Sequence, residues 1–370
     1  MWALPRPGGD FGRPALGRCL EAVAGQFKMP NVNTIALDAM GGDQAPPMVI
    51  AGADVARKRY PNTHFLIFGD DALCGPLLRR FSRLAAVAEV VHTEDIVAAD
   101  AKPSVAVRRG RKSSMWLAIN SVAERRANAV VSAGNTGALM AMSKLILKTL
   151  PGISRPAIAG LIPTRRSESV FLDLGANIEC GPENLIEFAL MGGILARAVL
   201  GVIRPTVGLL NVGEEEFKGR NELREVANVL RSKDTLFDFH GFVEGDDLTT
   251  GTTDVVVTDG FTGNITLKTL EGVSQAYSDF LRRSLRSSLS ARLGGMLARS
   301  AFRSLREKVD PRRHNGAMFV GLNGVAVKSH GSTDSLGFAN AIGVAVDIIE
   351  QGVNERIISE LSKIQSTETA

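Results

Sequence analysis

Short apolar, β-branched runs alternate with longer amphipathic stretches from Thr34 onward. Runs that end in Gly, Asn, Asp, Ser or Thr predict strands, and the stretches between them predict helices. The predicted strands cover 34–40, 65–70, 89–94, 129–133, 157–163, 169–175, 206–213, 254–260 and 325–331. The predicted helices cover 105–126, 136–150, 183–200, 221–232, 263–288 and 334–361. This alternation predicts a three-layer α/β/α fold around a largely parallel sheet.

The two ends of the chain differ from its middle. Residues 1–33 are rich in Pro, Gly and Arg and lack the apolar core of a signal peptide, so we expect a disordered extension. Met29 is an alternative start, because the folded pattern begins just after it. Residues 34–362 form the predicted domain, and the polar residues 363–370 form a predicted flexible tail.

Composition narrows the class of protein. The chain has 370 residues, of which 45% are hydrophobic and 22% charged, as in globular proteins, and a net charge of +4. The small basic excess permits an acidic partner or an anionic membrane surface. Aromatic residues are only 5% and no nucleic-acid motif is present, so no nucleic-acid partner is expected. The distant cysteines Cys19, Cys74 and Cys180 fit a reducing cytoplasm, and no apolar run predicts a membrane-spanning helix.

Six predicted strands end in small or polar residues. These ends are 38–43, 132–137, 173–177, 211–213, 258–264 and 329–333. In an open parallel sheet the carboxyl ends lie along one edge, where ligands bind, so the six loops together predict one composite site. Each loop taken alone is explained equally well by the glycines that strand-to-helix turns need.

Some of these loops carry groups that bind anions. The loop 132–137 leads directly into a helix, whose free amides and dipole favour phosphate or a phosphoryl group. Helix capping by Asn135 or Thr136 is the alternative. Lys218 follows another strand end and can hold phosphate or stabilise an oxyanion, unless it simply faces solvent. Asn264 can cap the helix after Gly-Phe-Thr-Gly or donate to a carbonyl group.

Other chemistries lack their signatures. No Gly-x-Gly-x-x-Gly turn, P-loop, His-Glu-x-x-His or Gly-x-Ser-x-Gly sequence is present. The five histidines do not cluster at metal-ligand spacing. We therefore expect neither a metal nor a nucleotide cofactor.

Seven ordered motifs between about Thr34 and Ser335 give the most specific signal. They read ALDAMGGDQAP, RRGRKSSM, SAGNTGALM, DLGAN, GLLNVGEEEFKG, DVVVTDGFTGNITLKTLEG and KSHGSTDS. Together they resemble the acyl-[acyl carrier protein]:phosphate acyltransferase family of phospholipid biosynthesis (PlsX). The one departure is His314-Asn315-Gly316-Ala317, where the family often has Tyr-Gly-Gly-Ala; it affects the detail of a loop near the site.

The resemblance implies a reaction and a set of site residues. Inorganic phosphate attacks the thioester of a long-chain acyl group on acyl carrier protein, without a cofactor, in a fold similar to isocitrate and isopropylmalate dehydrogenases and phosphate acetyltransferases. Lys218 and Asn264 match the motif positions at the reaction centre. The expected phosphate or acyl-phosphate ligands are Gly41, Gly42, Asp43, Ser132, Gly134, Asn135, Thr136, Gly137, Asn177, His330 and Ser332.

Two basic regions suggest partners. The cluster Arg108, Arg109, Arg111 and Lys112 is either a solvated helix face or a docking surface for the acidic carrier protein. In 280–313, leucines recur every four residues among Arg and Ser, which predicts a protruding amphipathic helical hairpin that breaks at Gly294-Gly295. Such a hairpin fits an anionic membrane surface, or buries its stripe in a homodimer, or does both. The predicted membrane contacts are Leu289, Leu293, Met296 and Leu297.

The sequence thus favours a cytoplasmic, peripherally membrane-associated, homodimeric acyltransferase. Two rivals remain, a short-chain phosphate acyltransferase that uses coenzyme A and a non-catalytic membrane scaffold for acyl carrier protein. A dehydrogenase is third, because the dinucleotide signature is missing. Direct contact with the downstream glycerol-3-phosphate acyltransferase is left open.

Overall fold

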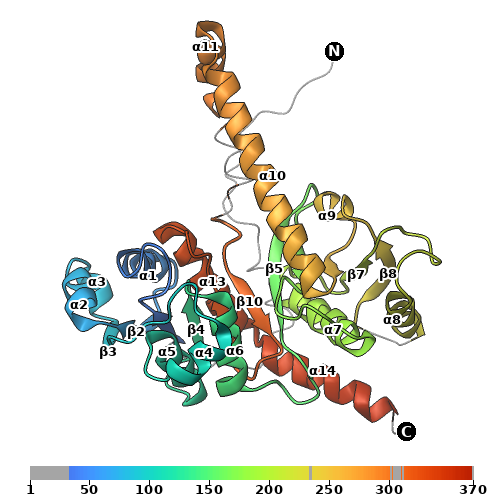
Figure 1. Ribbon diagram of the computed structural model, residues 1–370, viewed down its shortest axis with the longest axis horizontal. Helices are drawn as coiled ribbons and strands as arrows, with labels where there is room; N and C mark the ends of the chain where they lie inside the picture. Colours follow the sequence, from blue (N-terminus) through green and yellow to red (C-terminus); the bar gives the residue numbers. More distant parts are fainter. Residues whose placement is uncertain (1–32, 233–235, 301, 303–309, 311, 369–370) are drawn as a thin grey trace. The chain divides into compact units, whose positions relative to one another are not determined.

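The computed structural model describes residues 33–232, 236–300, 302, 310 and 312–368 (Figure 1). The predicted N-terminal extension, apart from its last residue, and the alternative start at Met29 lie outside these residues. The domain that begins at Asn33 forms a single unit by its internal contacts.

An 11-stranded sheet runs through this unit in the order β3-β2-β1-β4-β11-β10-β5-β6-β9-β7-β8. The strands are β1 (Asn33–Asp38), β2 (Thr63–Gly69), β3 (Ala88–His92), β4 (Ala129–Ser132), β5 (Ala157–Pro163), β6 (Glu168–Leu172), β7 (Thr206–Leu210), β8 (Asp238–Val243), β9 (Val255–Val257), β10 (Ala317–Val320) and β11 (Val325–Lys328). β10 is antiparallel to β11 and β5, and β5 is antiparallel to β6, whereas the other neighbours are parallel. The sheet is therefore largely parallel, as predicted.

The antiparallel pairs correct one expectation. Because strand direction reverses between β5 and β6, the strands β6 to β9 run opposite to β1, β4 and β11. Their carboxyl ends therefore do not follow one common edge of the sheet. The polar strand ends instead gather in two groups.

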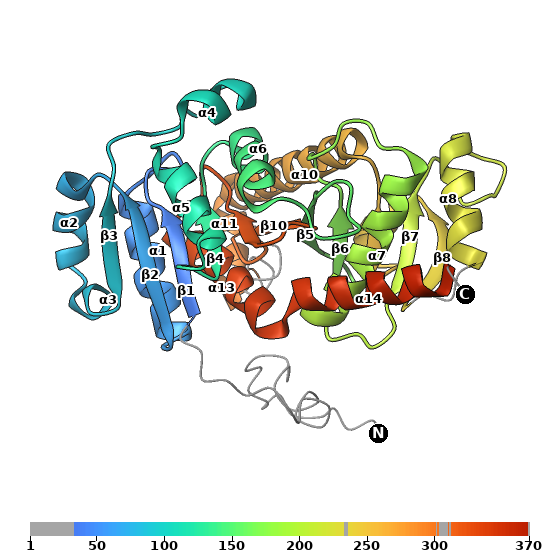
Figure 2. The ribbon, with the colours of Figure 1, turned by 90° about the horizontal axis from the view of Figure 1, so that it is seen from below.

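Helices cover both faces of the sheet (Figure 2). They are α1 (Pro47–Arg59), α2 (Asp71–Arg79), α3 (Ser82–Ala85), α4 (Pro103–Arg109), α5 (Ser114–Ala123), α6 (Thr136–Leu147), α7 (Pro182–Val199), α8 (Asn221–Ser232), α9 (Asp247–Thr250), α10 (Gly260–Arg286), α11 (Leu289–Leu297), α13 (Ser335–Gln351) and α14 (Val353–Glu368). One core takes buried residues of α1, α7, α8 and α13, and the other takes those of α5, α6 and α9. Ile35 and Leu37 enter the first core and Ala36 the second, as alternation along a doubly covered strand requires.

Several element boundaries differ from the predictions. The predicted helix 105–126 is two helices, because Gly110 ends α4 and the Ser113 side chain caps α5 by accepting from the amide of Trp116. The predicted helix 334–361 bends at Gly352, which has a φ of 59°. α14 then continues to Glu368, past the start of the predicted tail, since no Gly or Pro interrupts it. Two strands, β8 and β10, and four helices, α1, α2, α3 and α9, were not predicted.

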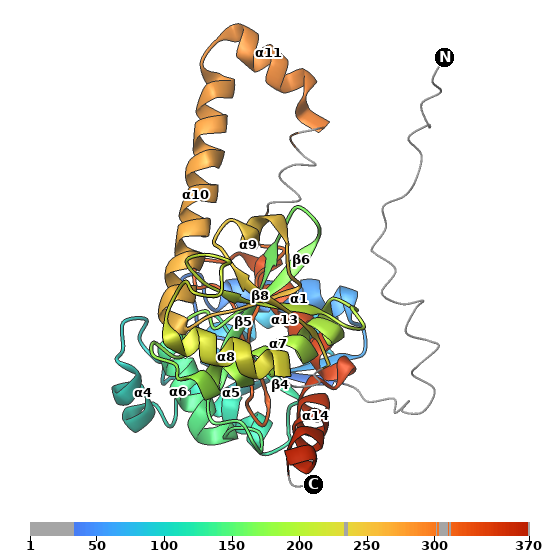
Figure 3. The same cartoon turned by 90° about the vertical axis from the view of Figure 1, so that its right-hand side faces the viewer.

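α10 and α11 project from the sheet as a long helical arm (Figures 1 and 3). The predicted break at Gly294-Gly295 is wrong, because α11 runs through both glycines. The chain turns instead between α10 and α11, where Ser288 accepts a hydrogen bond from the amide of Ala291 and so caps the second helix. Much of the return segment of the predicted hairpin lies outside the described residues.

The described helices were also compared with the length and hydropathy of a membrane span. No single one of them is both long and apolar enough to cross a bilayer, although α13 and the first part of α14 pass as a pair bent by 46°.

Candidate active site

The first loop group consists of residues 38–43, 132–137 and 329–333, which follow the adjacent strands β1, β4 and β11. The amide of Asp43 donates to the carbonyl of Gly331 over 2.9 Å, and the amide of Ser329 donates to the carbonyl of Ser132 over 2.8 Å. Gly41 lies so close to the second loop that a Cβ there would be 2.7 Å from the Gly134 nitrogen. The structure thus brings the predicted residues Gly41 to Asp43, Ser132 to Gly137, His330 and Ser332 together.

A buried carboxyl group stands behind these loops. Asp38 is 1% exposed and accepts hydrogen bonds of 2.6 Å from the hydroxyls of Ser114 and Ser132. Ser132 in turn accepts from the amide of Gly134 over 3.0 Å. Burial raises the pKa of Asp38, opposed by the two serine hydrogen bonds and by the nearby Lys328. Ser132 therefore braces the loop from inside, and its hydroxyl is already engaged.

Asn135 caps α6. Its side-chain oxygen accepts from the amide of Ala138 over 2.9 Å, and its amide nitrogen donates to the carbonyls of Ala99 and Ala101 over 2.8 and 3.0 Å. Of the two predicted roles, phosphate binding and helix capping, these contacts support capping for Asn135. Because both N–H groups of its side-chain amide already donate to carbonyls, none is left for phosphate. Thr136 is exposed in the first turn of α6.

The loop after β11 is held by Asn315, which belongs to the segment that departs from the family pattern. Asn315 is buried and donates over 2.8 Å both to the Ser329 hydroxyl and to the carbonyl of Gly337. It also accepts from the amide of His330 over 2.9 Å. Burial lowers the pKa of His330, and its Nδ1 lies 3.0 Å from the hydroxyl of Ser332. The segment His314-Asn315-Gly316-Ala317, which differs from the family pattern, thus contributes a residue that holds the loop after β11 in place.

The second loop group consists of residues 173–177, 211–220 and 258–264, after the adjacent strands β6, β7 and β9. Asp173 is 0% exposed, and one carboxylate oxygen accepts from the amides of Ile158, Gly175 and Ala176 over 3.0–3.1 Å. Its other oxygen accepts from the backbone and side-chain amides of Asn177 over 2.7 and 2.9 Å. The Asn177 side chain also donates to Pro156 over 2.8 Å. Asn177 was predicted to bind phosphate, but its backbone and side-chain N–H groups donate to acceptors inside the protein instead.

Lys218 projects from the second loop group toward solvent. Its side chain is 41% exposed and its Nζ lies 2.7 Å from Oε2 of Glu215. The hydrogen bond that Lys218 donates to Glu215 raises the pKa of Lys218, so the side chain is a cation and not a base. Asn211, which was not predicted, supports this loop by donating to the carbonyls of Gly213 and Lys218 over 3.1 and 3.2 Å.

Asn264 lies in the second turn of α10. Asp259 caps this helix by accepting from the amide of Thr262 over 2.8 Å, so the expectation that Asn264 itself caps the helix is wrong. The exposed Asn264 side chain lies against Gly175, where a Cβ would be 2.8 Å from its Nδ2. Arg220 donates to Asp259 over 2.6 Å and so links the Lys218 loop to the start of α10.

α10 connects the two loop groups electrostatically. It begins in the second group, and its Lys268 and Glu271 act on the charge of His330 in the first group. Among the described residues, no hydrogen bond or ion pair joins Lys218 to the first loop group. The structure therefore groups the predicted site residues in two sets and leaves Lys218 turned toward Glu215.

The predicted carrier-docking cluster lies beside the first loop group. Arg108, Arg109, Arg111 and Lys112 are all exposed, at the end of α4 and in the turn before α5. α4 packs on the start of α6, where a Cβ on Gly137 would be 2.8 Å from Pro103. Arg111 lies 5.9 Å from the ring centroid of Trp116.

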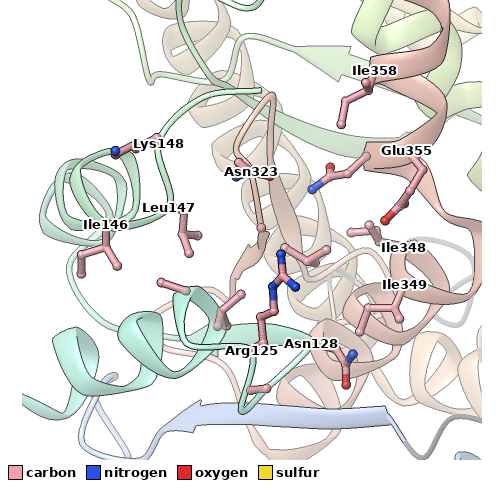
Figure 4. Close-up of a pocket in the computed structure, with 16 residues that line it drawn as sticks. Arg125, Asn128, Ile146, Leu147, Lys148, Asn323, Ile348, Ile349, Glu355 and Ile358 are labelled. Atoms are coloured by element: carbon pink, nitrogen blue, oxygen red, sulfur yellow. The ribbon is translucent and has the colours of Figure 1, made fainter. Parts of the chain in front are cut away.

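A cavity of about 550 Å³ lies elsewhere, at the amino ends of β4 and β11 (Figure 4). Asn128, Leu147, Asn323 and Ile348 are among its lining residues. It is therefore at the opposite ends of these strands from the first loop group. In the described part of the chain, no cluster of His, Cys, Asp and Glu side chains could hold a metal ion.

Comparison with known proteins identifies the family. Residues 33–356 match the family model of a fatty acid synthesis protein. The phosphate acyltransferase of Rhodospirillum centenum is 60% identical over 90% of this chain and 94% of its own length. That of Rhodospirillum rubrum is 58% identical over 91% of this chain and 97% of its own. The chain belongs to the phosphate acyltransferase family. The resemblance seen in the sequence motifs is thereby confirmed, and the chain is an acyltransferase of lipid biosynthesis.

Solved structures support the fold of this phosphate acyltransferase. A phosphotransacetylase from Streptococcus pyogenes matches with a TM-score of 0.57 and 16% identity, over 86% of this chain and 94% of its own. The EutD phosphotransacetylase from Staphylococcus aureus gives a TM-score of 0.55 and 16% identity, over 87% and 94%. At this identity the likeness concerns the fold alone, and it confirms the predicted α/β/α architecture.

Proposed function

We propose that this acyltransferase moves a long-chain acyl group from acyl carrier protein to inorganic phosphate, in the cytoplasm, giving acyl-phosphate for phospholipid synthesis. The observation that carries the proposal is the difference between the two loop groups. The first offers glycine-rich backbone close to a helix start, which suits an anion. The second offers an exposed ammonium and an exposed amide, which suit the oxygen of a thioester carbonyl.

The reaction needs positioning more than proton transfer. A phosphate oxygen forms a bond to the thioester carbon, and the carbonyl electrons move onto its oxygen. When the carbonyl reforms, the carbon–sulfur bond breaks and its electron pair leaves on the carrier thiolate. Phosphate is already anionic at neutral pH, so alignment of the two reactants and stabilisation of the oxyanion supply the catalysis.

Lys218 and Asn264 are the proposed oxyanion donors. Lys218 is charged, and within the described part of the chain its ammonium pairs only with the exposed Glu215, which it can exchange for the developing oxyanion. The Asn264 amide has no hydrogen-bond partner in the described residues and stands at a fixed place on α10 beside Gly175. Gly41, Gly42, Asp43, Gly134, Thr136, Gly137, His330 and Ser332 remain the proposed surroundings of the phosphate.

The donor is tested by phosphate-dependent release of thiol from palmitoyl-acyl carrier protein, with palmitoyl-coenzyme A and acetyl-coenzyme A in parallel. We expect release from the carrier-protein thioester only when phosphate is present, and a new acyl-phosphate signal by ³¹P NMR. Faster turnover of acetyl-coenzyme A would instead support the short-chain enzyme. Binding of acyl carrier protein without release would support the scaffold.

Carrier protein is proposed to dock on the basic cluster of Arg108, Arg109, Arg111 and Lys112. All four side chains are free to meet an acidic surface, and α4 packs against the start of α6 next to the first loop group. Reversing charge at Arg108 and Arg109 should raise the KM for acyl carrier protein, and raised ionic strength should reproduce this in the wild type. An unchanged KM would exclude this surface.

The projecting helices α10 and α11 carry the proposed membrane and dimer contacts (Figure 3). Leu289 and Leu297 near the tip are 83% and 80% exposed, and Leu293 and Met296 are exposed beside them. Between residues 281 and 300 there are five arginines and no acid. This combination fits the surface of an anionic bilayer. Lower on α10, Val273, Tyr277 and Phe280 form an exposed apolar face that we assign to the partner subunit.

Two double variants separate these contacts. Leu293→Glu with Leu297→Glu should abolish flotation with phosphatidylglycerol vesicles and leave the dimer intact. Tyr277→Glu with Phe280→Glu should give a monomer by light scattering and retain flotation. If both variants behave alike in both measurements, the division of the arm into two surfaces is wrong.

A further inference from the structure

A row of polar side chains crosses three adjacent strands at the first loop group. Lys328 at the end of β11 pairs in register with Ser132 at the end of β4, and Leu37 pairs with Val131, which places Asp38 beside Ser132. Side chains in register on neighbouring strands point to the same face of a sheet. Carboxyl, hydroxyl and ammonium groups therefore stand side by side, with Ser132 bonded to Asp38 over 2.6 Å.

Lys328 is the cation of this row. Its Nζ donates to the carbonyl of Ala133 over 3.3 Å and to the carbonyl of Ser329. An ammonium group has three N–H donors, and among the described residues only these two carbonyls accept from it. No carboxylate forms an ion pair with Lys328 within the described chain, although Asp38 and Asp43 act on its charge from a distance. A part-buried cation thus faces the loops with one N–H donor that has no acceptor among the described residues.

We propose that Lys328 is the residue whose positive charge holds inorganic phosphate in the first loop group. The inference rests on the proposed function and deepens it. In this proposal the two lysines have different roles. Lys328 binds the phosphate nucleophile, and Lys218 stabilises the carbonyl oxygen. The loops also position it well, because the carbonyls of Ala133 and Ser329 orient the ammonium and Asp38 compensates its charge from behind.

Direct phosphate binding tests the inference without turnover. Titration of the free protein with inorganic phosphate, followed by ³¹P NMR, should show a Kd about 10- to 100-fold higher for Lys328→Met, as expected when a charged hydrogen bond is lost. Lys328→Arg keeps the charge and should recover most of the affinity. Lys144→Met, an exposed lysine on α6, is the matched control and should bind as the wild type does. Thermal unfolding of each variant identifies any loss of folding.

Steady-state kinetics give a second readout. Lys328→Met should raise the KM for phosphate far more than it lowers kcat, whereas Lys218→Ala should do the reverse. Burial lowers the pKa of Lys328 to about 8. The groups that act on it are Asp38 and Asp43 from the first loops and Lys268 from α10, and it acts in turn on His330. Because the cation is lost as pH rises, kcat/KM for phosphate should fall above about pH 8 in the wild type, and this fall should move to higher pH in Lys328→Arg.

The outcomes separate the two levels of proposal. A folded Lys328→Met protein that binds phosphate as tightly as the wild type overturns the inference about Lys328. If the wild type binds phosphate through Lys328 but releases no thiol from acyl carrier protein, the inference stands and the proposed donor fails.

Discussion

The two loop groups contain the same kinds of residue, but they use their polar groups differently. In the second group, Asp173 accepts hydrogen bonds from five backbone and side-chain donors, while Lys218, paired with Glu215, and Asn264 present their polar groups at the surface. In the first group, the buried carboxyl of Asp38 accepts from the hydroxyls of Ser114 and Ser132 and from the backbone of Met40. In the first group, backbone amides and the part-buried ammonium of Lys328 face the loops, whereas the second group presents exposed side chains on a hydrogen-bonded backbone. A polar loop therefore reveals its role only when the partners of each donor are known.

The strongest test of this contrast removes the side chains that the second group presents. Lys218→Ala and Asn264→Ala should each lower kcat by about 100- to 1000-fold, the usual effect of losing one oxyanion donor. Unfolding temperatures should not change, because Asn264 is exposed and the Lys218 side chain is 41% exposed. Lys144→Ala and Gln275→Ala, exposed residues on α6 and α10, are matched controls. Near-wild-type kcat in both variants would remove the second group from the reaction.

The second test compares how much the hydrogen bonds around each of the two buried carboxyl groups, Asp173 and Asp38, contribute to the free energy of unfolding. Asp173→Asn replaces one accepting carboxylate oxygen with an NH₂ group that faces backbone N–H donors. The free energy of unfolding, measured in urea, should therefore fall by about 3 kcal/mol. Ser132→Ala removes the hydroxyl that donates to Asp38 and accepts from Gly134, and should cost about 1 kcal/mol because Asp38 keeps its hydrogen bond from Ser114. Asp100→Asn, at an exposed position, is the control. Equal losses in the first two variants would mean that the two groups are scaffolded alike.

Two glycine substitutions, one in each loop group, test whether the two groups have separate roles in catalysis and in phosphate binding. At Gly175, which has a φ of +130°, a Cβ would strain the backbone and stand 2.8 Å from Nδ2 of Asn264. Gly175→Ala should therefore lower kcat, by about tenfold for a small misplacement of Asn264. At Gly41 a Cβ would meet the backbone of Gly134, so Gly41→Ala should mainly raise the KM for phosphate. Kinetics that show the same KM and kcat changes for both would contradict the separate roles.

The smallest expected effect concerns the link between the Lys218 loop and α10. The Arg220 side chain is 66% exposed, so Arg220→Gln should lower kcat by no more than about fivefold. Burial opposes ionisation of Asp259, but hydrogen bonds from Thr262 and Arg220 outweigh it and lower its pKa below 3.8. A lowered acid pKa stabilises the fold above the unfolded-state pKa, and this stability is lost as pH falls through the folded-state pKa. The stability difference between wild type and variant should thus be present at pH 7 and should decline progressively as pH falls below about 4. A difference that does not decline at all as the solution is acidified would show that the ion pair is not its cause.

Much of the fold could be predicted because apolar runs report burial. Nine strands were found in this way. β8 was missed because Asp238 and His240 interrupt its apolar pattern, and β10 was missed as well. The direction of a strand leaves no mark in its own sequence, so the reversal at β5 and β6 was invisible. Gly294 and Gly295 were taken for a helix break, although the cap at Ser288 decides where the chain turns.

The site was predicted where its residues form motifs and missed where they are buried. The motifs led to the exposed residues Lys218 and Asn264, but a sequence does not say which charges lie inside. Asp173 and Lys328 stood in recognised motifs without being singled out, since only the fold shows that one is enclosed by amides and the other by carbonyls. Asn135 could equally cap a helix or bind an anion, because both roles favour the same residue at the same position.

The insertion of β11 between β4 and β10 has a consequence for the newly made chain. Asp43 emerges from the ribosome early, yet its backbone partner Gly331 is translated almost at the end of the domain. Until then β4 keeps one open edge, which is a site where strands of other chains can pair. The nascent enzyme therefore completes its first loop group last, and a truncated product lacks both that site and the strand that covers this edge.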